Sequence, residues 1–473
     1  MVVYNEFLII ACSYKYLFKN RGGKVLKNNW KDKFKFNAVQ TLAIGFALVI
    51  LLGGILLSLP ICSQDGSATS FIDSVFTSTT AVCVTGLVTV DTGTHWNYIG
   101  KTIIMILIQV GGLGFMSFAT LLAILIGKKI TLKDRLVMQE AMNTFNIQGL
   151  VKMVRYIMVF TFSVEGLGAL LYSTQFIPSF GIAKGIYYSI FHSVSAFCNA
   201  GIDLFGEFRS LTIYNDNAVI ILTTAALIII GGLGFAVWIE IYNFKGIKKL
   251  SFHTKMVLTI TLILLTAGAL LMFIFEFNNP GTMKEMNLKD KLLNSFFASV
   301  TPRTAGFNSI STADMTAAGK LLTIILMFIG GSSGSTAGGI KTTTFGVLVF
   351  TLISTIKGRE DTEVFRRRIS KETVYKSFAI FSIALALVLS VTMILSVTEI
   401  SQPFEYLLYE ATSAFGTVGL TLGLTPKLSI IGKVVIILTM YCGRVGPLTV
   451  AVALTKAKKK PNYKYPEDKI LVG

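Results

Sequence analysis

Charged residues, cysteine and histidine are scarce in this sequence, and each shortage argues against a class of protein. Only 14% of the 473 residues are charged and 53% are hydrophobic, a balance more apolar than a soluble protein of this size needs. The five cysteines show no metal-ligand spacing, so neither a disulfide framework nor a zinc site is predicted. The three histidines have no partner pattern for a metal. HExxH and Walker motifs, a Ser-Lys dyad and paired carboxylates at membrane depth are also missing, which argues against an enzyme.

Long apolar runs dominate the sequence instead. Eight stretches approach or exceed the ~20 residues that a helix needs to cross a membrane. They lie near 38–59, 102–126, 156–176, 218–242, 256–277, 321–354, 378–397 and 430–454. The sixth is too long for one helix and contains Gly, Ser and Lys341. The predicted fold class is therefore an all-α polytopic membrane protein.

The positive charge lies on one side of the predicted membrane. Most of the 43 Lys and Arg residues fall in five segments, 1–36, 127–155, 243–256, 355–376 and the tail 455–473. The positive-inside rule places these segments and both termini in the cytoplasm, as an even number of spans requires. The net charge of +18 therefore does not indicate nucleic-acid binding. Residues 1–36 are interpreted as a basic cytoplasmic arm, because their apolar piece is too short to span and no signal-peptide pattern follows it.

A short Ser-, Thr- and Gly-rich stretch recurs between the two spans of each pair. The four copies read FTSTTAVCVTGL (76–87), FHSVSAFCNAGI (191–202), FFASVTPRTAGF (296–307) and YEATSAFGTVGL (409–420). In each, an aromatic residue lies ten positions before a glycine, and a glycine cluster follows in the next span, at 111, 231, 330 and 443. This predicts four tandem repeats of helix, re-entrant segment and second helix, over 37–126, 150–243, 254–354 and 373–454.

Such re-entrant segments suit a cation pore. Non-helical backbone at membrane depth must be buried in protein or line a wet cavity. If four segments meet on a pseudo-fourfold axis, each short helix directs its partially negative C-terminal end at the centre. Glycine then allows a turn that presents carbonyl oxygens, which replace the hydration shell of a monovalent cation. The neighbouring side chains vary and no carboxylate flanks the glycines, so backbone ligation is expected. The predicted filter residues are Val84, Thr85, Gly86, Asn199, Ala200, Gly201, Thr304, Ala305, Gly306, Thr417, Val418 and Gly419.

These motifs together resemble the Trk/Ktr/HKT superfamily of potassium transporters, most closely the membrane subunit of the bacterial Ktr system. The resemblance extends from about residue 37 to the C-terminus and also includes GGSSGSTAGGIK and the closing YPEDKILVG. It implies potassium uptake across the bacterial cell membrane by a homodimer that rests on a cytosolic ring of KtrA-type RCK subunits binding ATP or ADP. No cofactor is expected on this chain, potassium is the expected substrate, and sodium is a candidate activator. The alternative is a sodium-conducting or sodium-coupled transporter of the same fold, although retention of Gly86 favours potassium.

Glycine and serine in the sixth span predict an intramembrane loop, because each Gly costs a helix about 1 kcal/mol relative to Ala. The resemblance implies that this loop is a gate. The predicted gate residues are Gly330, Gly331, Ser332, Ser333, Gly334, Ser335, Thr336, Ala337, Gly338, Gly339 and Lys341. Lys341 either holds a closed conformation or extends to the cytoplasmic interface.

Two further charges fall at membrane depth. An unpaired Arg444 would cost at least a few kcal/mol there, so we expect it to face the pore or a carboxylate, and the resemblance suggests an electrostatic barrier. Glu165 is a candidate structural partner for a basic residue, and Arg303 a candidate brace of the third filter segment. The glycine clusters at 111 and 231 are interpreted as close helix packing.

Residues near the two membrane surfaces leave alternatives open. Asp91 and Asp203, near the outer mouth, either concentrate cations or are ordinary loop acids. The basic loops 127–155 and 355–376 are predicted to dock the cytosolic ring, with anionic lipid as the alternative partner.

Overall fold

The computed structural model describes residues 38–114, 116–120, 126, 130–142, 149–244, 246–447, 449–450, 466 and 468. The described part of the chain is helical apart from one small antiparallel hairpin, β1 (Glu363–Val364) and β2 (Arg367–Arg368). This confirms the predicted all-α class. The predicted N-terminal arm and nearly all of the C-terminal tail lie outside the described residues.

A long helix opens each predicted repeat. These helices are α3 (Ala38–Leu57), α9 (Leu150–Phe180), α13 (Phe252–Glu276) and α17 (Lys371–Thr398). Among the described residues, these four are long and apolar enough to cross a membrane without a break. On α3, Leu48 and Leu52 are exposed whereas Phe46 and Ile50 are buried. Exposed apolar side chains on such a helix are suited to a lipid surface.

A shorter helix follows in each repeat and corresponds to the predicted re-entrant segment. These pore helices are α4 (Phe71–Val82), α10 (Ile182–Phe197), α14 (Leu288–Val300) and α18 (Phe404–Gly416). Three of them are fastened to the long helix of their own repeat by a serine hydroxyl that donates to a main-chain oxygen. The bonds are Ser78 to Ile50 O at 2.7 Å, Ser193 to Glu165 O at 2.6 Å and Ser299 to Leu265 O at 2.9 Å.

The second helix of each repeat is short or broken. The segments are α6 (Tyr98–Gly112), α11 (Ala218–Gly232) with α12 (Phe235–Tyr242), α15 (Ala317–Phe328) with α16 (Thr342–Ile356), and α19 (Ile430–Val445). The sequence predicted an interruption in the sixth span alone, but α11 and α12 are also bent by 99°. The physical reason is a left-handed glycine at the break, Gly234 with φ +96°.

The glycine clusters carry both packing and these breaks. A Cβ added at Gly111, Gly231 or Gly443 would lie 2.0 Å from a carbonyl oxygen near the end of the pore helix of the same repeat. The predicted close packing at 111 and 231 is therefore confirmed. Three residues further on, Gly114 and Gly446 repeat the left-handed backbone of Gly234, with φ of +79° and +97°.

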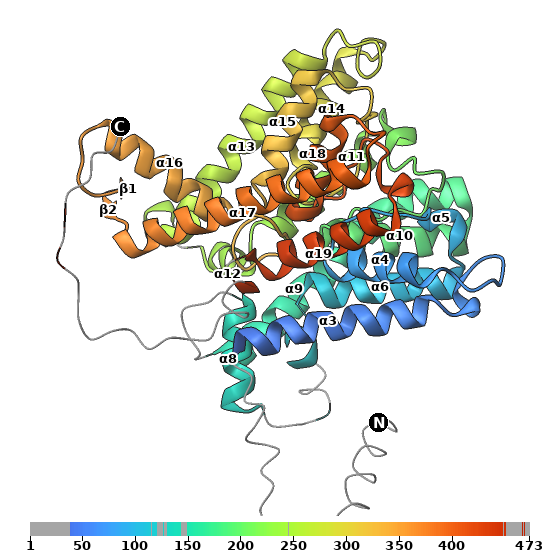
Figure 1. Ribbon diagram of the computed structural model, residues 1–473, viewed down its shortest axis with the longest axis horizontal. Coiled ribbons are helices and arrows are strands. Elements are labelled where there is room, and N and C mark those ends of the chain that lie inside the picture. The colour runs from blue at the N-terminus through green and yellow to red at the C-terminus, as the bar shows by residue number, and fades with distance from the viewer. Residues whose placement is uncertain are drawn as a thin grey trace, which may run out of the picture. The chain divides into compact units, whose positions relative to one another are not determined.

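The four repeats close into a ring. Each second helix packs against the pore helix of the next repeat, α6 on α10, α11 on α14, α15 on α18, and α19 back on α4; Figure 1 shows α19 beside α4. A polar contact links each such pair of repeats. These are Thr102 Oγ1 to Tyr187 OH (3.1 Å), Asn294 Nδ2 to Asn215 O (2.8 Å), Lys320 to Glu405 (3.1 Å) and Lys433 to Asp73 (2.7 Å).

Short elements complete the described chain. They are η1 (Pro60–Cys62), α5 (Thr92–His95), α8 (Leu132–Met142), η2 (Thr212–Tyr214), η3 (Ile247–Lys249) and η4 (Thr425–Lys427).

Candidate functional site

The four predicted filter glycines form the centre of the ring. All have left-handed backbone, with φ of +97° at Gly86, +64° at Gly201, +82° at Gly306 and +93° at Gly419. A Cβ added to any of them would meet the carbonyl oxygen of the residue before the glycine of the next repeat. Measured from the added Cβ, the distances are 2.7 Å from Gly86 to Ala200 O, 2.4 Å from Gly201 to Ala305 O, 2.5 Å from Gly306 to Val418 O and 2.2 Å from Gly419 to Thr85 O. The last contact returns to the first repeat, so the four segments surround one axis.

The residue two positions before each glycine is also left-handed. Val84, Asn199, Thr304 and Thr417 have φ between +50° and +65° and are fully buried. This conformation costs an L-residue roughly 1–2 kcal/mol, and most for a β-branched one, so the surrounding structure must hold it in place. Although the side chains differ, all four positions share the same backbone geometry.

Hydroxyl groups hold three of these segments, a feature that the sequence analysis missed. Thr80, Ser195 and Ser413 each lie six positions before a filter glycine. Their oxygens accept from Gly86 N at 2.8 Å, Ile202 N at 3.1 Å and Gly419 N at 3.1 Å. Through these bonds, N–H groups of the filter segments bind side chains of the pore helices. The carbonyl oxygens of the residues before the glycines instead face the glycine of the neighbouring repeat. The recurring hydroxyl was visible in the aligned repeats.

The predicted gate segment is a non-helical loop between α15 and α16, which we call the gate loop (330–339). Its ends are joined by bonds from Gly330 N to Ile340 O at 2.8 Å and from Thr342 N to Gly331 O at 3.0 Å. The loop lies against the break between α11 and α12. Ser332 N donates to Gly232 O at 3.0 Å, and Phe235 N donates to Gly334 O at 2.9 Å.

Two basic side chains of this region donate hydrogen bonds to main-chain oxygens. Lys341 Nζ donates to Ala337 O at 2.7 Å and to Gly338 O at 3.4 Å, so the side chain folds back on the gate loop. Arg444 Nη1 donates to Thr336 O, and its Nη2 donates to Gly111 O and Gly112 O. Arg444 therefore joins the gate loop to the first repeat through carbonyl groups, and not through the carboxylate considered above.

A cavity of about 370 Å³ lies beside the gate loop, towards the first turns of α3 and α17. Lys341, Lys376 and Arg444 contribute to its lining, and among the residues that the structure describes no Asp or Glu does. Basic side chains thus supply all of the ionisable groups in the described lining.

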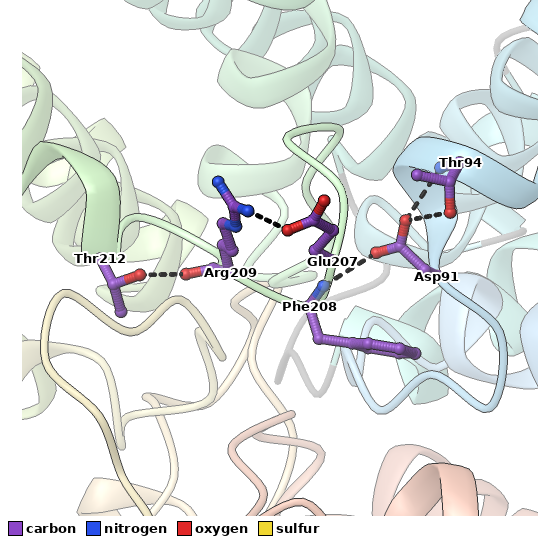
Figure 2. A network of polar contacts seen from close by, with 6 residues as sticks. All are labelled: Asp91, Thr94, Glu207, Phe208, Arg209 and Thr212. Atoms are coloured by element: carbon purple, nitrogen blue, oxygen red, sulfur yellow. Dashed lines mark hydrogen bonds and ion pairs between the residues drawn. The ribbon is translucent and has the colours of Figure 1, made fainter.

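The outer loops brace neighbouring repeats. Asp91 accepts from Thr94 N at 2.9 Å and from Phe208 N of the second repeat at 3.1 Å, as Figure 2 shows. In the same network Glu207 pairs with Arg209, whose carbonyl accepts from Thr212 Oγ1 at 2.7 Å (Figure 2). Asp91 thus caps the N-terminus of α5 and joins it to the second repeat. Asp203 accepts from Phe205 N at 3.0 Å.

Glu165 and Arg303 are buried without an opposite charge beside them in the described part of the chain. Glu165, which we considered as a candidate partner for a basic residue, accepts from Gln109 Nε2 at 3.1 Å and contacts Cys198, and no basic side chain pairs with it among the described residues. Arg303 donates from Nη2 to Thr261 Oγ1 at 3.3 Å, and its Nε has no hydrogen-bond partner among the described residues.

Long apolar helices, with four shorter helices whose following segments close one ring in the described part of the chain, are typical of a membrane transport protein. Residues 14–465 match the family model described as a cation transport protein, TrkH. The potassium/sodium uptake protein NtpJ of Enterococcus hirae is 47% identical over 93% of this chain and 98% of its own. The Ktr system potassium uptake protein B of Bacillus subtilis is 43% identical over 94% and 99%. The chain belongs to the TrkH family of cation transport proteins.

A solved structure shares the fold. The crystal structure of the potassium transporter TrkH from Vibrio parahaemolyticus matches with a TM-score of 0.69, over 96% of this chain and 91% of that chain, at 18% identity. The predicted membership of the Trk/Ktr superfamily is confirmed by the family match and the relatives, as is the expectation of a transporter that is not an enzyme.

Proposed function

We propose that this protein takes up potassium across the bacterial cell membrane through the ring of Gly86, Gly201, Gly306 and Gly419. The carrying observation is the closed sequence of contacts in which each glycine abuts the carbonyl oxygen of the next repeat. Such a ring offers main-chain oxygens at one level without a carboxylate, which suits a monovalent cation that must shed and regain its water. The membrane potential supplies about 2.3 kcal/mol per charge for each 100 mV.

Sodium is the second candidate ion, because a relative that is 47% identical bears the name potassium/sodium uptake protein. We place potassium first because every repeat retains a glycine at the ring, and a side chain at that point would displace the neighbouring carbonyl. Sodium then acts as an activator or a minor substrate.

Ion flux into proteoliposomes containing the purified chain tests the proposal. Potassium flux should exceed sodium flux, and single replacements of the ring glycines by Ser should lower that preference, because each Cβ would lie within 2.7 Å of a ring oxygen. Equal potassium and sodium flux through the unaltered protein, or an unchanged preference in all four variants, would reject the filter.

Within the same proposal, the gate loop closes the path below the ring and Arg444 holds it closed. Arg444 binds the loop at Thr336 O and the first repeat at Gly111 O, and three basic side chains line the adjoining cavity. Both observations support this role. Release of these bonds would open the path, and Lys341 would steady the loop in either position.

We also propose that the protein is a homodimer with a cytosolic ring of RCK subunits that bind ATP or ADP. The support is the Ktr system to which relatives of 43% and 37% identity are assigned by name. The β1–β2 hairpin is a suitable contact, because Val364 and Ile369 are buried while Phe365, Arg366 and Arg367 are exposed at its tip.

Co-purification tests this docking surface. Replacing Arg366 and Arg367 by Glu should release the cytosolic ring, whereas the matched change at Arg368, which already pairs with Asp361 at 2.9 Å, should weaken it less. Retention of the ring, together with lost binding to anionic vesicles, would assign the charges to lipid instead.

A further inference from the structure

The gate loop touches the filter directly. Thr336 is fully buried in the middle of the loop, and its Oγ1 lies 3.3 Å from Phe197 O and 3.3 Å from Asn199 Oδ1. Phe197 ends the second pore helix, and Asn199 is the left-handed filter residue of the second repeat. A segment 137 residues further along the chain therefore reaches a filter side chain and the end of a pore helix, and its one hydroxyl proton is shared between these two acceptors.

Asn199 continues the contact into the third repeat. Its Nδ2 faces Arg303 O at 3.4 Å and Thr304 Oγ1 at 3.5 Å. A carboxamide accepts on one side and donates on the other, so this residue joins the gate loop to a neighbouring filter segment. The equivalent Val84 has no polar group, and the Thr417 hydroxyl has no hydrogen-bond partner among the residues described.

The other end of the gate loop meets the filter as well. A Cβ added at Gly338 would lie 2.1 Å from Thr417 Oγ1, the filter residue of the fourth repeat. The loop therefore lies against the filter residues of the second and fourth repeats, which alternate around the ring. Movement of the loop must change the surroundings of both, since packed side chains leave no slack.

We propose that Thr336 and Asn199 are positioning residues that make the potassium preference of the ring depend on the gate loop. Asn199 precedes Ala200, whose carbonyl oxygen abuts Gly86 in the ring. The bond from Thr336 holds Asn199 in its left-handed conformation, and loss of that bond lets the Ala200 oxygen leave its place. This inference rests on the proposed function of the glycine ring, and it adds that gating and selectivity are coupled through one side-chain pair.

Replacement of the Thr336 hydroxyl tests the relay. We expect Thr336→Val, which keeps the shape of the side chain, to lower the ratio of potassium to sodium flux in proteoliposomes by up to about tenfold. A tenfold change corresponds to about 1.4 kcal/mol, the upper range for one hydrogen bond. Thr336→Ser restores the hydroxyl and should restore the ratio. The control is Thr266→Val on the exposed face of α13, where the hydroxyl bonds to main-chain oxygens of its own helix, with Leu262 O at 2.8 Å.

A double variant tests whether the two side chains act together. Asn199→Ala by itself should lower the ratio of potassium to sodium flux. Adding Thr336→Val to it should lower that ratio little further, because the bond between the two side chains is already lost. Two independent, additive losses would overturn the relay, as would a Thr336→Ser protein that behaves like Thr336→Val.

Gly201→Ser, measured in the same assay, separates this inference from the filter assignment. A ratio that falls for Gly201→Ser and stays unchanged for Thr336→Val rejects the relay and leaves the filter in place. A ratio unchanged in both variants rejects the filter at Gly201 and the relay with it.

Discussion

The ring of filter glycines is the same in all four repeats, whereas the layer beneath it, made of the breaks in the second helices and the gate loop, differs between repeats. In the ring, every repeat makes the same contact with the next one, glycine against carbonyl oxygen. Beneath it, the first, second and fourth repeats each have one left-handed glycine, at Gly114, Gly234 and Gly446, where the third has a ten-residue loop. Equivalence around an axis is what a carbonyl ring requires, whereas a single loop beneath the ring requires that one repeat differ.

A single chain with four unequal repeats can satisfy both requirements. In a pore made of four identical subunits, any change beneath the ring would appear four times. Here the gate loop occurs once, and Arg444 of the fourth repeat reaches it once. The third filter segment also differs, because Thr301 lies five positions before its glycine and not six. The asymmetry is thus concentrated in and around the third repeat.

The largest expected effect breaks the ring itself. Gly419 and Gly423 have nearly the same backbone, with φ of +93° and +92°, but a Cβ at Gly419 would lie 2.2 Å from Thr85 O and a Cβ at Gly423 would meet nothing within 4 Å. Gly→Ala at either site therefore costs a similar ~1–2 kcal/mol in backbone strain. We expect Gly419→Ala to lower potassium uptake strongly and Gly423→Ala to retain it.

Uptake in a strain that lacks its own potassium transporters measures this, with membrane protein quantified by immunoblot. Equal losses in both variants at equal protein levels would mean that backbone strain, and not contact within the ring, sets the requirement for glycine.

The ring was predictable from the sequence, whereas the layer beneath it was predictable only in part. Long apolar runs specify helices locally, and the aromatic residue ten positions before each glycine marks a repeated geometry, so the spans and filter positions follow from the pattern. The break at Gly234 did not follow, because GGLGF suits both tight packing and a left-handed turn. Position 234 needs glycine because its φ is +96° and because a gate-loop oxygen, Ser333 O, would lie 2.8 Å from a Cβ there.

Contacts between distant segments were also beyond sequence reasoning. The partners of Arg444 are main-chain oxygens more than 100 residues away, and no side-chain pattern encodes a carbonyl acceptor. Along the chain, the predicted filter residues and the predicted gate residues are separate segments. In space Thr336 joins them, at a distance that only the folded ring determines.

An intermediate effect is expected below the ring, at Arg444. Arg444→Gln removes a guanidinium that binds carbonyls of the gate loop and of the first repeat, and it lowers the positive charge of the cavity. Both changes ease cation passage, so basal potassium flux through the purified chain should rise. The rise should be about tenfold for each 1.4 kcal/mol by which the free energy favouring the closed loop decreases. Arg444→Lys keeps the positive charge but loses the planar guanidinium that donates to several carbonyls at once. Its flux should lie between those of the unaltered protein and of Arg444→Gln. A fall in flux with unchanged protein folding would contradict a closing role for Arg444.

The smallest effect separates the helix break of the second repeat from its counterpart in the fourth. Gly234 and Gly446 have φ of +96° and +97°, so Ala strains both equally, but only Gly234 abuts the gate loop at Ser333 O, 2.8 Å from an added Cβ. Beyond Gly234, α12 is anchored to the start of α13, where Ser251 Oγ donates to Glu240 at 2.7 Å, so the break cannot move freely to relieve the contact. Gly234→Ala should therefore displace the loop and raise basal potassium flux a few-fold more than Gly446→Ala does, with similar losses of thermal stability in the two variants. If Gly446→Ala raised the flux as much, the break itself would regulate the path in every repeat, and the special status of the third repeat would be lost.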